Sequence, residues 1–330
     1  AADTSQFGTS AKFDFPNFKT YPDVDTFDSQ VDCVSMEDMV QLGEQLISTI
    51  TEHTPDILCQ ATITKGLISV RLINSKGGEA GYSKSLFKMS LEGVLVKNED
   101  MLFVGDSQSS CHPILDFKPI AEEVTNQLEL AKRNVTIPSR SMPVIFTPRG
   151  VASSLMAPLI FAFNGKIVLD GASPLKDKLG QQVFDRKFSL WDDATIHYQI
   201  ASYPCDDEGV PGQKTPLVDH GKVCHFLYDL HTAALLNTQS TGNGNRHGGL
   251  PTPSPSSLVI DKGNVPFHDM VKDIREGLVI ELLMGAEQGN ILNGDFSGNV
   301  LLGFKIENGE IIGRVKDTMV SGNVYQVLTQ

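Results

Sequence analysis

The sequence lacks the features that would assign it to nucleic acid or to a membrane. It has 27 Lys and Arg residues against 40 Asp and Glu residues, and no run rich in Lys or Arg. The formal net charge of -13 therefore disfavours a phosphate backbone or an anionic bilayer as the main partner. Its longest apolar stretch, Val151–Phe163, is too short to span a bilayer and contains Pro158. We expect no direct contact with nucleic acid and no membrane partner.

Cysteine is scarce, and the chain has no C-x-x-C pair. An odd number of scattered thiols does not form a disulfide framework and is typical of a reducing compartment. The first ten residues also lack the basic and apolar regions of a signal peptide. We therefore expect a cytoplasmic protein, and the missing initiator Met indicates a chain trimmed or cut from a longer one. The five cysteines are Cys33, Cys59, Cys111, Cys205 and Cys224.

The sequence has no recognisable zinc motif, since H-E-x-x-H and any His pair at helical spacing beside a Glu are absent. Only the segment DHGKVCHFLYDLH gathers three histidines. We expect His220 in a hairpin turn, and His225 and His231 on one face of a strand because they are an even number of residues apart. No ligand spacing is met, so we predict no metal site and no cofactor.

The usual nucleophile motifs are absent or incomplete. Ser85–Lys88 and Ser173–Lys176 match S-x-x-K, but S-D-N and K-T-G are missing and the first lies in an alternating, strand-like run. Cys224 and His225 are sequence neighbours, so on a strand they face opposite ways. The acidic residues after Cys205 should raise the pKa of its thiol, which disfavours a thiolate nucleophile.

What the sequence does contain is a pattern of many short strands with few helices, which favours an α+β fold. Ser35 and Asp38 form a capping box before a helical repeat that extends to about His53. Residues 59–104 alternate around the turn SKGGE, and Pro119 fits the first turn of a further helix. Residues 1–34 resemble an extended arm. Beyond Gly165 we expect strands at KFSLW, TIHYQIA, KTPLVD, SSLVI, GLVIELLMG, VLLGFKIENGEII and RVKDTMV, with a helix at FHDMVKDIR and a tight hairpin turn at ENGE.

One stretch, Met142–Lys166, raises the question of a catalytic site. It predicts a buried strand at Pro143–Thr147, a turn at Pro148–Gly150 and an apolar helix, a layout that many enzymes use to present a reactive side chain. A second stretch, Ser240–Gly249, is a glycine-rich loop with Arg246. Its backbone N–H groups could bind an anion or a peptide carbonyl, and the alternative is a flexible loop with turn glycines.

From Trp191 onward the order and spacing of several motifs resemble the TldD/PmbA family, whose names link it to peptidases and to modulation of DNA gyrase. The motifs are SLWDDATI, the run from PCDDEGVPG to STGNGNR, GLVIELLMG and NGDFSGNVLLGFKIENGEI. The resemblance implies a two-part, mixed or antiparallel, β-rich α+β architecture. We place an N-terminal α/β part at residues 1–140, lacking the family's first unit, and a β-rich domain with few helices at residues 141–330.

The resemblance also implies a role. The TldD branch carries His-Glu-x-x-x-His on the helix that follows the strand at Val144–Thr147, and here Met156–Phe161 (MAPLIF) occupies that position without any ligand. The chain is thus similar to the PmbA (TldE) branch, which lacks the zinc motif and partners a zinc-bearing, TldD-like subunit. We expect that partner, or a homodimer where it is absent, together with a peptide substrate held in a chamber. The candidate peptide-binding residues are Asp207, Glu208, Gly209, Thr241, Gly242, Gly244 and Arg246.

Two alternatives stay open at this stage. One is a hydrolase or peptidase that uses Cys224 or an unrecognised metal site formed by the histidines. The other is a structural scaffold that makes no contact with peptide.

Overall fold

The N-terminal half is built on one long antiparallel sheet. The computed structural model describes residues 11–329, and in it three consecutive strands pair in the order β1-β2-β3. The β1–β2 hairpin is paired from Leu58 opposite Val94 to Ile73 opposite Glu79, and its turn is the predicted SKGGE segment. The strands are β1 (Leu58–Ile73), β2 (Glu79–Lys97) and β3 (Asp100–Ser110). The arm predicted for residues 1–34 can be followed from Ala11 and ends in the short helix α2 (Gln30–Cys33); residues 1–10 lie outside the described part.

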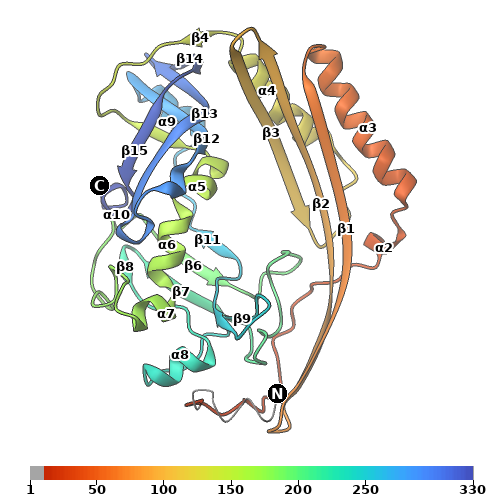
Figure 1. Cartoon of the computed structure of the whole chain (residues 1–330), viewed down its shortest axis with the longest axis vertical. Coiled ribbons are helices and arrows are strands. Elements are labelled where there is room, and N and C mark those ends of the chain that lie inside the picture. Colours follow the sequence, from red (N-terminus) through yellow and green to blue (C-terminus); the bar gives the residue numbers. More distant parts are fainter. Residues whose placement is uncertain (1–10, 330) are drawn as a thin grey trace.

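Two helices pack against this sheet (Figure 1). Helix α3 (Met36–His53) begins where the sequence predicts, because the Ser35 hydroxyl accepts the Asp38 N–H and the Asp38 carboxylate accepts the Ser35 N–H. Helix α4 (Lys118–Leu130) has Pro119 in its first turn. The apolar faces of both helices share a core with the three strands and with two strands of the C-terminal half.

The C-terminal half contains three further sheets, in which most strand pairs are antiparallel. Six strands form the largest sheet, ordered β4-β14-β13-β12-β5 with β15 also on β13; the other sheets are β11-β6-β7-β8 and β10-β9. The strands are β4 (Asn134–Val135), β5 (Val144–Phe146), β6 (Leu190–Asp193), β7 (Lys214–Asp219), β8 (Lys222–Val223), β9 (Gly244–Asn245), β10 (Thr252–Pro253), β11 (Leu258–Ile260), β12 (Glu276–Met284), β13 (Asp295–Glu307), β14 (Glu310–Val315) and β15 (Met319–Asn323). This arrangement confirms the predicted α+β class.

Short helices connect and cover these strands. They are α5 (Pro148–Ser154), α6 (Met156–Phe163), α7 (Gly165–Leu169), α8 (Leu230–Leu235), α9 (Phe267–Lys272) and α10 (Val324–Val327), with two single 3₁₀ turns at Ala286–Gln288 and Ile291–Asn293. The predicted turn at Pro148–Gly150 is wrong. The Thr147 side chain accepts the Gly150 N–H, so Pro148 begins helix α5 instead.

Two tight turns agree with the sequence and one predicted strand does not. His220 and Asn308 both have positive φ and precede a glycine with positive φ, as a two-residue hairpin turn requires. The strand expected at TIHYQIA (Thr195–Ala201) is absent. Its start is instead held in a turn by Asp193, whose carboxylate accepts the Thr195 N–H, and Tyr198 has a φ of 60°.

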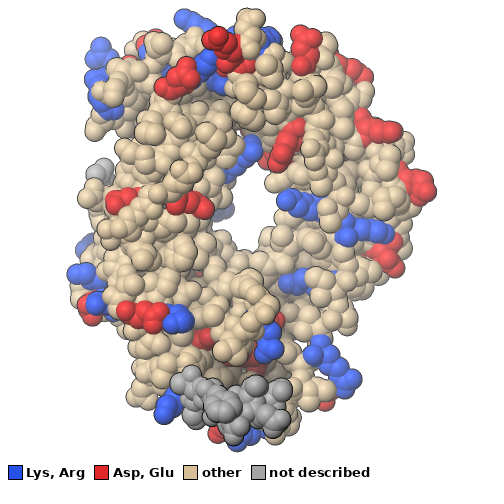
Figure 2. All heavy atoms as spheres, in the orientation of Figure 1, with Lys and Arg blue, Asp and Glu red and all other residues tan. Residues whose placement is uncertain are grey.

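The two halves enclose an opening that passes through the molecule (Figure 2). In Figure 1, β3 and α4 lie on one side of it, and α5 and β12 lie on the other. The halves meet at Gly105 of β3, whose N–H and carbonyl are both bonded by the Gln127 side chain of α4 within the N-terminal half. Arg149 of α5 donates to the same Gly105 carbonyl. Farther along, the β1–β2 hairpin runs to the loops of the C-terminal half, where the candidate site lies.

Candidate functional site

The site begins with a tight acidic turn between Cys205 and Pro211. The Asp206 carboxylate accepts the N–H groups of Glu208 (3.0 Å) and Val210 (2.9 Å), and the Gly209 N–H bonds the Asp206 carbonyl. Gly209 has a φ of 80°, a conformation that favours glycine. Burial, with a contribution from Asp207, raises the pKa of Asp206 to about 6.

The glycine-rich loop lies directly against this turn. The second oxygen of Asp206 accepts the Gly244 N–H at 2.8 Å, and the Asp207 N–H bonds the Gly244 carbonyl at 3.0 Å. The Asp207 carboxylate in turn accepts the Arg246 N–H at 2.7 Å. Because each loop satisfies the polar groups of the other, the two segments form one unit although they are far apart in the sequence.

Glycine is needed in this loop because the neighbouring atoms are close. Gly242 has a φ of 70°, and a Cβ there would lie 2.4 Å from the Pro211 carbonyl oxygen. A Cβ on Gly244 would lie 2.4 Å from Oε2 of Glu208. Thr241 anchors the start of the loop, since its hydroxyl accepts the Tyr228 N–H at 2.8 Å. These three residues are buried behind the surface of the site.

Glu208 is the most unusual group in the site, because only 5% of it is exposed. One carboxylate oxygen accepts the Leu230 N–H at 2.7 Å, where helix α8 begins. The other oxygen accepts no hydrogen bond from the described residues. Burial, reinforced by Asp206 and Asp229, raises the pKa of Glu208 to about 7, although the Leu230 N–H and Arg246 act in the opposite direction.

The tip of the β1–β2 hairpin closes the site and creates a cavity of about 310 Å³, which we call the hairpin-tip pocket. The hydroxyl of Tyr21, in the arm, donates to the Gly209 carbonyl at 3.2 Å. Asn74 holds the hairpin turn, because its side-chain oxygen accepts the N–H groups of Lys76 and Gly78. The pocket is lined by Phe15, Tyr21, Leu72, Ile73, Asn74, Ser75, Gly78, Glu79, Ala80, Asp207, Glu208, Gly209 and Arg246.

The candidate residues from the sequence are thus close together in the structure. Asp207, Glu208, Gly209 and Arg246 line the pocket, whereas Thr241, Gly242 and Gly244 support it from behind. Sequence reasoning missed the contribution of the arm and of the hairpin tip. The turn SKGGE was recognised, but its sequence carries no signal for the loop that it meets.

The segment Met156–Phe161, which the resemblance aligned with a metal motif, lies in helix α6. Helix α5 ends at Ser154, and Pro158 lies in the first turn of α6, where a missing N–H interrupts no intrahelical bond. Leu159 and Phe163 are 2% and 1% exposed and belong to the core. Phe161 is 40% exposed and faces a cavity of about 410 Å³ with a largely apolar wall.

The remaining candidates for chemistry are separated from one another. His225 bonds the Pro216 carbonyl, and His231 lies in helix α8, so the expectation that both share a strand face is wrong. Within residues 11–329 no group of three or more His, Cys, Asp or Glu residues is arranged to hold a metal ion. The thiol of Cys224 is only partly exposed, and burial together with Asp206 and Asp207 raises the pKa of Cys205 to about 12.

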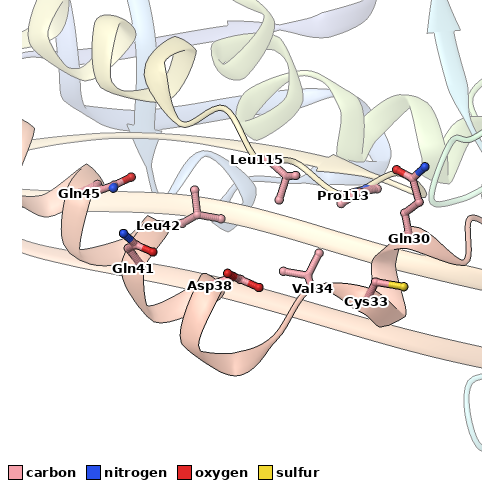
Figure 3. A pocket seen from close by; sticks show the side chains of 9 residues that line it. All are labelled: Gln30, Cys33, Val34, Asp38, Gln41, Leu42, Gln45, Pro113 and Leu115. Atoms are coloured by element: carbon pink, nitrogen blue, oxygen red, sulfur yellow. The ribbon is translucent and has the colours of Figure 1, made fainter.

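A larger cavity of about 520 Å³ lies between α2, α3 and the segment after β3. Figure 3 shows Val34 and Leu42 pointing from the helical side toward Pro113 and Leu115. Its carboxylate, Asp38, is already engaged in the capping box of α3. The hairpin-tip pocket is therefore the better candidate, since it contains ionisable groups that are free to meet a ligand.

In the described part of the chain, no helix is long and apolar enough to cross a membrane.

Comparison with known proteins finds similar proteins and a matching family. The family described as PmbA/TldA metallopeptidase C-terminal domain matches residues 139–330. An uncharacterized protein of Methanocaldococcus jannaschii is 26% identical over 99% of this chain and 74% of its own length. A metalloprotease of the same organism is 30% identical over 63% of this chain, but the match covers only 46% of that protein.

A solved structure agrees over the whole chain. TldE from Thermococcus kodakarensis is 25% identical, with a TM-score of 0.83, and the match covers 100% of this chain and 76% of that one. The family match, which includes the acidic turn, the glycine-rich loop and helix α6, covers more than half of the residues. The chain belongs to the TldD/PmbA family.

Proposed function

We propose that this chain is a non-catalytic, TldE-like subunit of a TldD-type metalloprotease assembly in the cytoplasm, and that it holds an unfolded peptide for a zinc-bearing partner. The observation that carries the proposal is the chemistry of helix α6. Its segment Met156–Phe161 offers no imidazole, carboxylate or thiolate, so it can neither coordinate zinc nor activate a water molecule.

The hairpin-tip pocket supports the peptide-holding part of the proposal. The Arg246 side chain is exposed at the pocket and makes no hydrogen bond or ion pair within residues 11–329. A guanidinium carries five N–H donors in a fixed geometry, which suits the carbonyl groups of an extended peptide. Such contacts depend on the peptide backbone and are independent of its sequence.

The partner is part of the same proposal. A TldD-like subunit would supply the zinc, and a homodimer is the alternative where no such subunit exists. A hydrolase that uses Cys224 is less well supported, because that thiol donates to the Lys222 carbonyl and its sequence neighbour His225 bonds elsewhere.

The test uses Arg246→Ala and, as a matched control, Arg186→Ala, which removes an exposed arginine that does not line the pocket. We expect Arg246→Ala to weaken the binding of several unrelated unfolded peptides about tenfold, measured by fluorescence anisotropy, and to slow their cleavage by a TldD-type partner. Arg186→Ala should change neither. Unchanged binding and cleavage with Arg246→Ala would favour a purely structural scaffold.

A further inference from the structure

The hairpin-tip pocket is lined by a largely buried carboxylate, Glu208, which has one oxygen available to a ligand. Only 5% of the Glu208 residue surface is exposed, and one of its carboxylate oxygens accepts the Leu230 N–H. The second oxygen lies in a residue that lines the cavity and accepts no hydrogen bond within the described chain. Because Glu208 is largely removed from water, a ligand in the cavity that donates to its second oxygen would stabilise the ionised carboxylate.

The charges around the pocket favour a cationic ligand. Among the described residues that line the cavity, the acids are Glu79, Asp207 and Glu208, against one cation, Arg246. Glu79 is paired with Arg71 at 2.8 Å, whereas the carboxylates of Asp207 and Glu208 each accept one backbone N–H. Glu208 is the most deeply buried of the three acids, so it has the least compensation from water. Behind it, Asp206 and Asp229 are close enough to disfavour its ionised form. Arg246 acts against this excess but forms no ion pair with Glu208.

The walls of the pocket suit a long, amphipathic side chain. Leu72, Ile73 and Ala80 at the hairpin end provide an aliphatic surface on one side. Phe15 is 43% exposed, and it lines the same cavity with Tyr21. Lysine and arginine bury an aliphatic stem along apolar surface and present a cationic head, which aromatic rings and a carboxylate both attract.

We infer that the hairpin-tip pocket binds a basic side chain, lysine or arginine, of the held peptide, with Glu208 as its counter-charge. This inference rests on the proposed function, because it assigns the substrate class of the same site. It gives the subunit a sequence preference in addition to the backbone contacts of Arg246.

The test compares peptides that differ at one position. Short unfolded peptides with a central lysine, norleucine or glutamate are titrated at a pH near 8 against the wild-type chain, Glu208→Gln and Glu310→Gln. Glutamine keeps an acceptor for the Leu230 N–H, so the fold is retained, which circular dichroism checks. Glu310 is exposed in the β13–β14 turn and serves as the control. We expect the lysine peptide to bind about tenfold more tightly than the norleucine peptide, and Glu208→Gln alone to abolish that difference.

A second measurement uses pH. Asp206, Asp229 and Arg246 act electrostatically on Glu208, and Tyr21, Glu79 and Asp207 line the same cavity. Burial raises the pKa of Glu208 to about 7. The preference for lysine should therefore increase as the pH rises through that value in the wild-type chain and stay flat in Glu208→Gln. A lysine preference that survives Glu208→Gln, or its absence in the wild-type chain, would overturn the inference.

The two proposals can fail separately. If all three peptides bind equally, the chain holds peptides but the pocket does not select a basic side chain. Nα-acetyl-lysine methylamide, with its norleucine analogue as control, probes the pocket without an extended peptide. If the lysine compound binds in a Glu208-dependent way and no unfolded peptide binds, the pocket has the inferred chemistry and the peptide-holding function is wrong. If neither binds, both are wrong.

Discussion

At the scale of single residues, the acidic turn and the glycine-rich loop depend on each other. Gly244 has room for no side chain, because a Cβ there would lie 2.4 Å from the Glu208 carboxylate. Gly249, in the same loop, has no atom within 4 Å of its Cβ position. Substitution of Gly249 therefore serves as the control for substitution of Gly244.

We expect Gly244→Ala to displace the Glu208 carboxylate and to lower the free energy of unfolding by about 1–3 kcal/mol, as overpacking does. Gly249→Ala should change it by less than about 0.5 kcal/mol. Urea denaturation of both variants measures the difference. Equal stabilities would show that the loop moves away from Glu208 without cost.

The buried acids should make stability depend on pH. Burial raises the pKa of Asp206 to about 6 and of Glu208 to about 7, both above their ordinary values. The folded state therefore binds these protons more tightly than the unfolded state, and the resulting stabilisation is lost as the pH rises through those two values. We expect the free energy of unfolding to fall between about pH 4 and about pH 7, and to fall less steeply in Glu208→Gln. A decline of equal steepness in the variant would contradict the assignment to Glu208.

At the scale of residues, the sequence alone predicted some of the residues that line the site. Arg246 could be chosen because it lies in a glycine-rich loop whose backbone N–H groups can bind a peptide. Asp207, Glu208 and Gly209 could be chosen because the family resemblance implies a chamber that they would line. The partners in the arm and hairpin could not, since Phe15 and Glu79 are ordinary residues whose position depends on tertiary packing. The raised pKa of Glu208 follows from burial, which no local pattern encodes.

At the scale of elements, helix α3 was predictable because its start is encoded locally. The capping box of Ser35 and Asp38 and the repeat of apolar residues both act within a few residues. Removing the Ser35 hydroxyl leaves the Asp38 N–H without its partner.

We expect Ser35→Ala to lower the free energy of unfolding by about 1 kcal/mol. Ser48→Ala in the same helix removes only an exposed hydrogen bond to Glu52, and should have an effect of less than about 0.5 kcal/mol. Chemical denaturation compares the two. If Ser48→Ala costs as much as Ser35→Ala, the capping box does not stabilise the helix.

Elements decided by long-range contacts were harder to predict. The segment Thr195–Ala201 alternates like a strand, yet the Tyr198 N–H bonds the Asp25 carbonyl and the Tyr198 carbonyl accepts the Cys111 N–H. These partners lie in distant parts of the sequence, so a local pattern could not reveal that the segment turns. His231 was misassigned for a different reason, since the local cap was overlooked: the Asp229 side chain accepts the Thr232 N–H and begins the short helix α8.

At the scale of the whole molecule, the α+β class and the family are established, while the division into residues 1–140 and 141–330 stays a proposal. The family match begins at residue 139, but the core around α4 also includes Val279 and Phe304 of the C-terminal half. The opening in Figure 2 arises from this arrangement, in which the two halves meet at α4 and again at the hairpin tip. No sequence pattern predicted it, since it depends on how far a long hairpin extends.

The central claim is that this chain holds a peptide and leaves cleavage to a zinc-bearing partner. The most direct measurement is hydrolysis of an unfolded peptide by the purified chain with added zinc, alone and together with a TldD-type subunit, with bound zinc quantified in each sample. The account predicts no cleavage and no stoichiometric zinc for the chain alone, and cleavage when the partner is present. Stoichiometric zinc and zinc-dependent cleavage by the chain alone would contradict it.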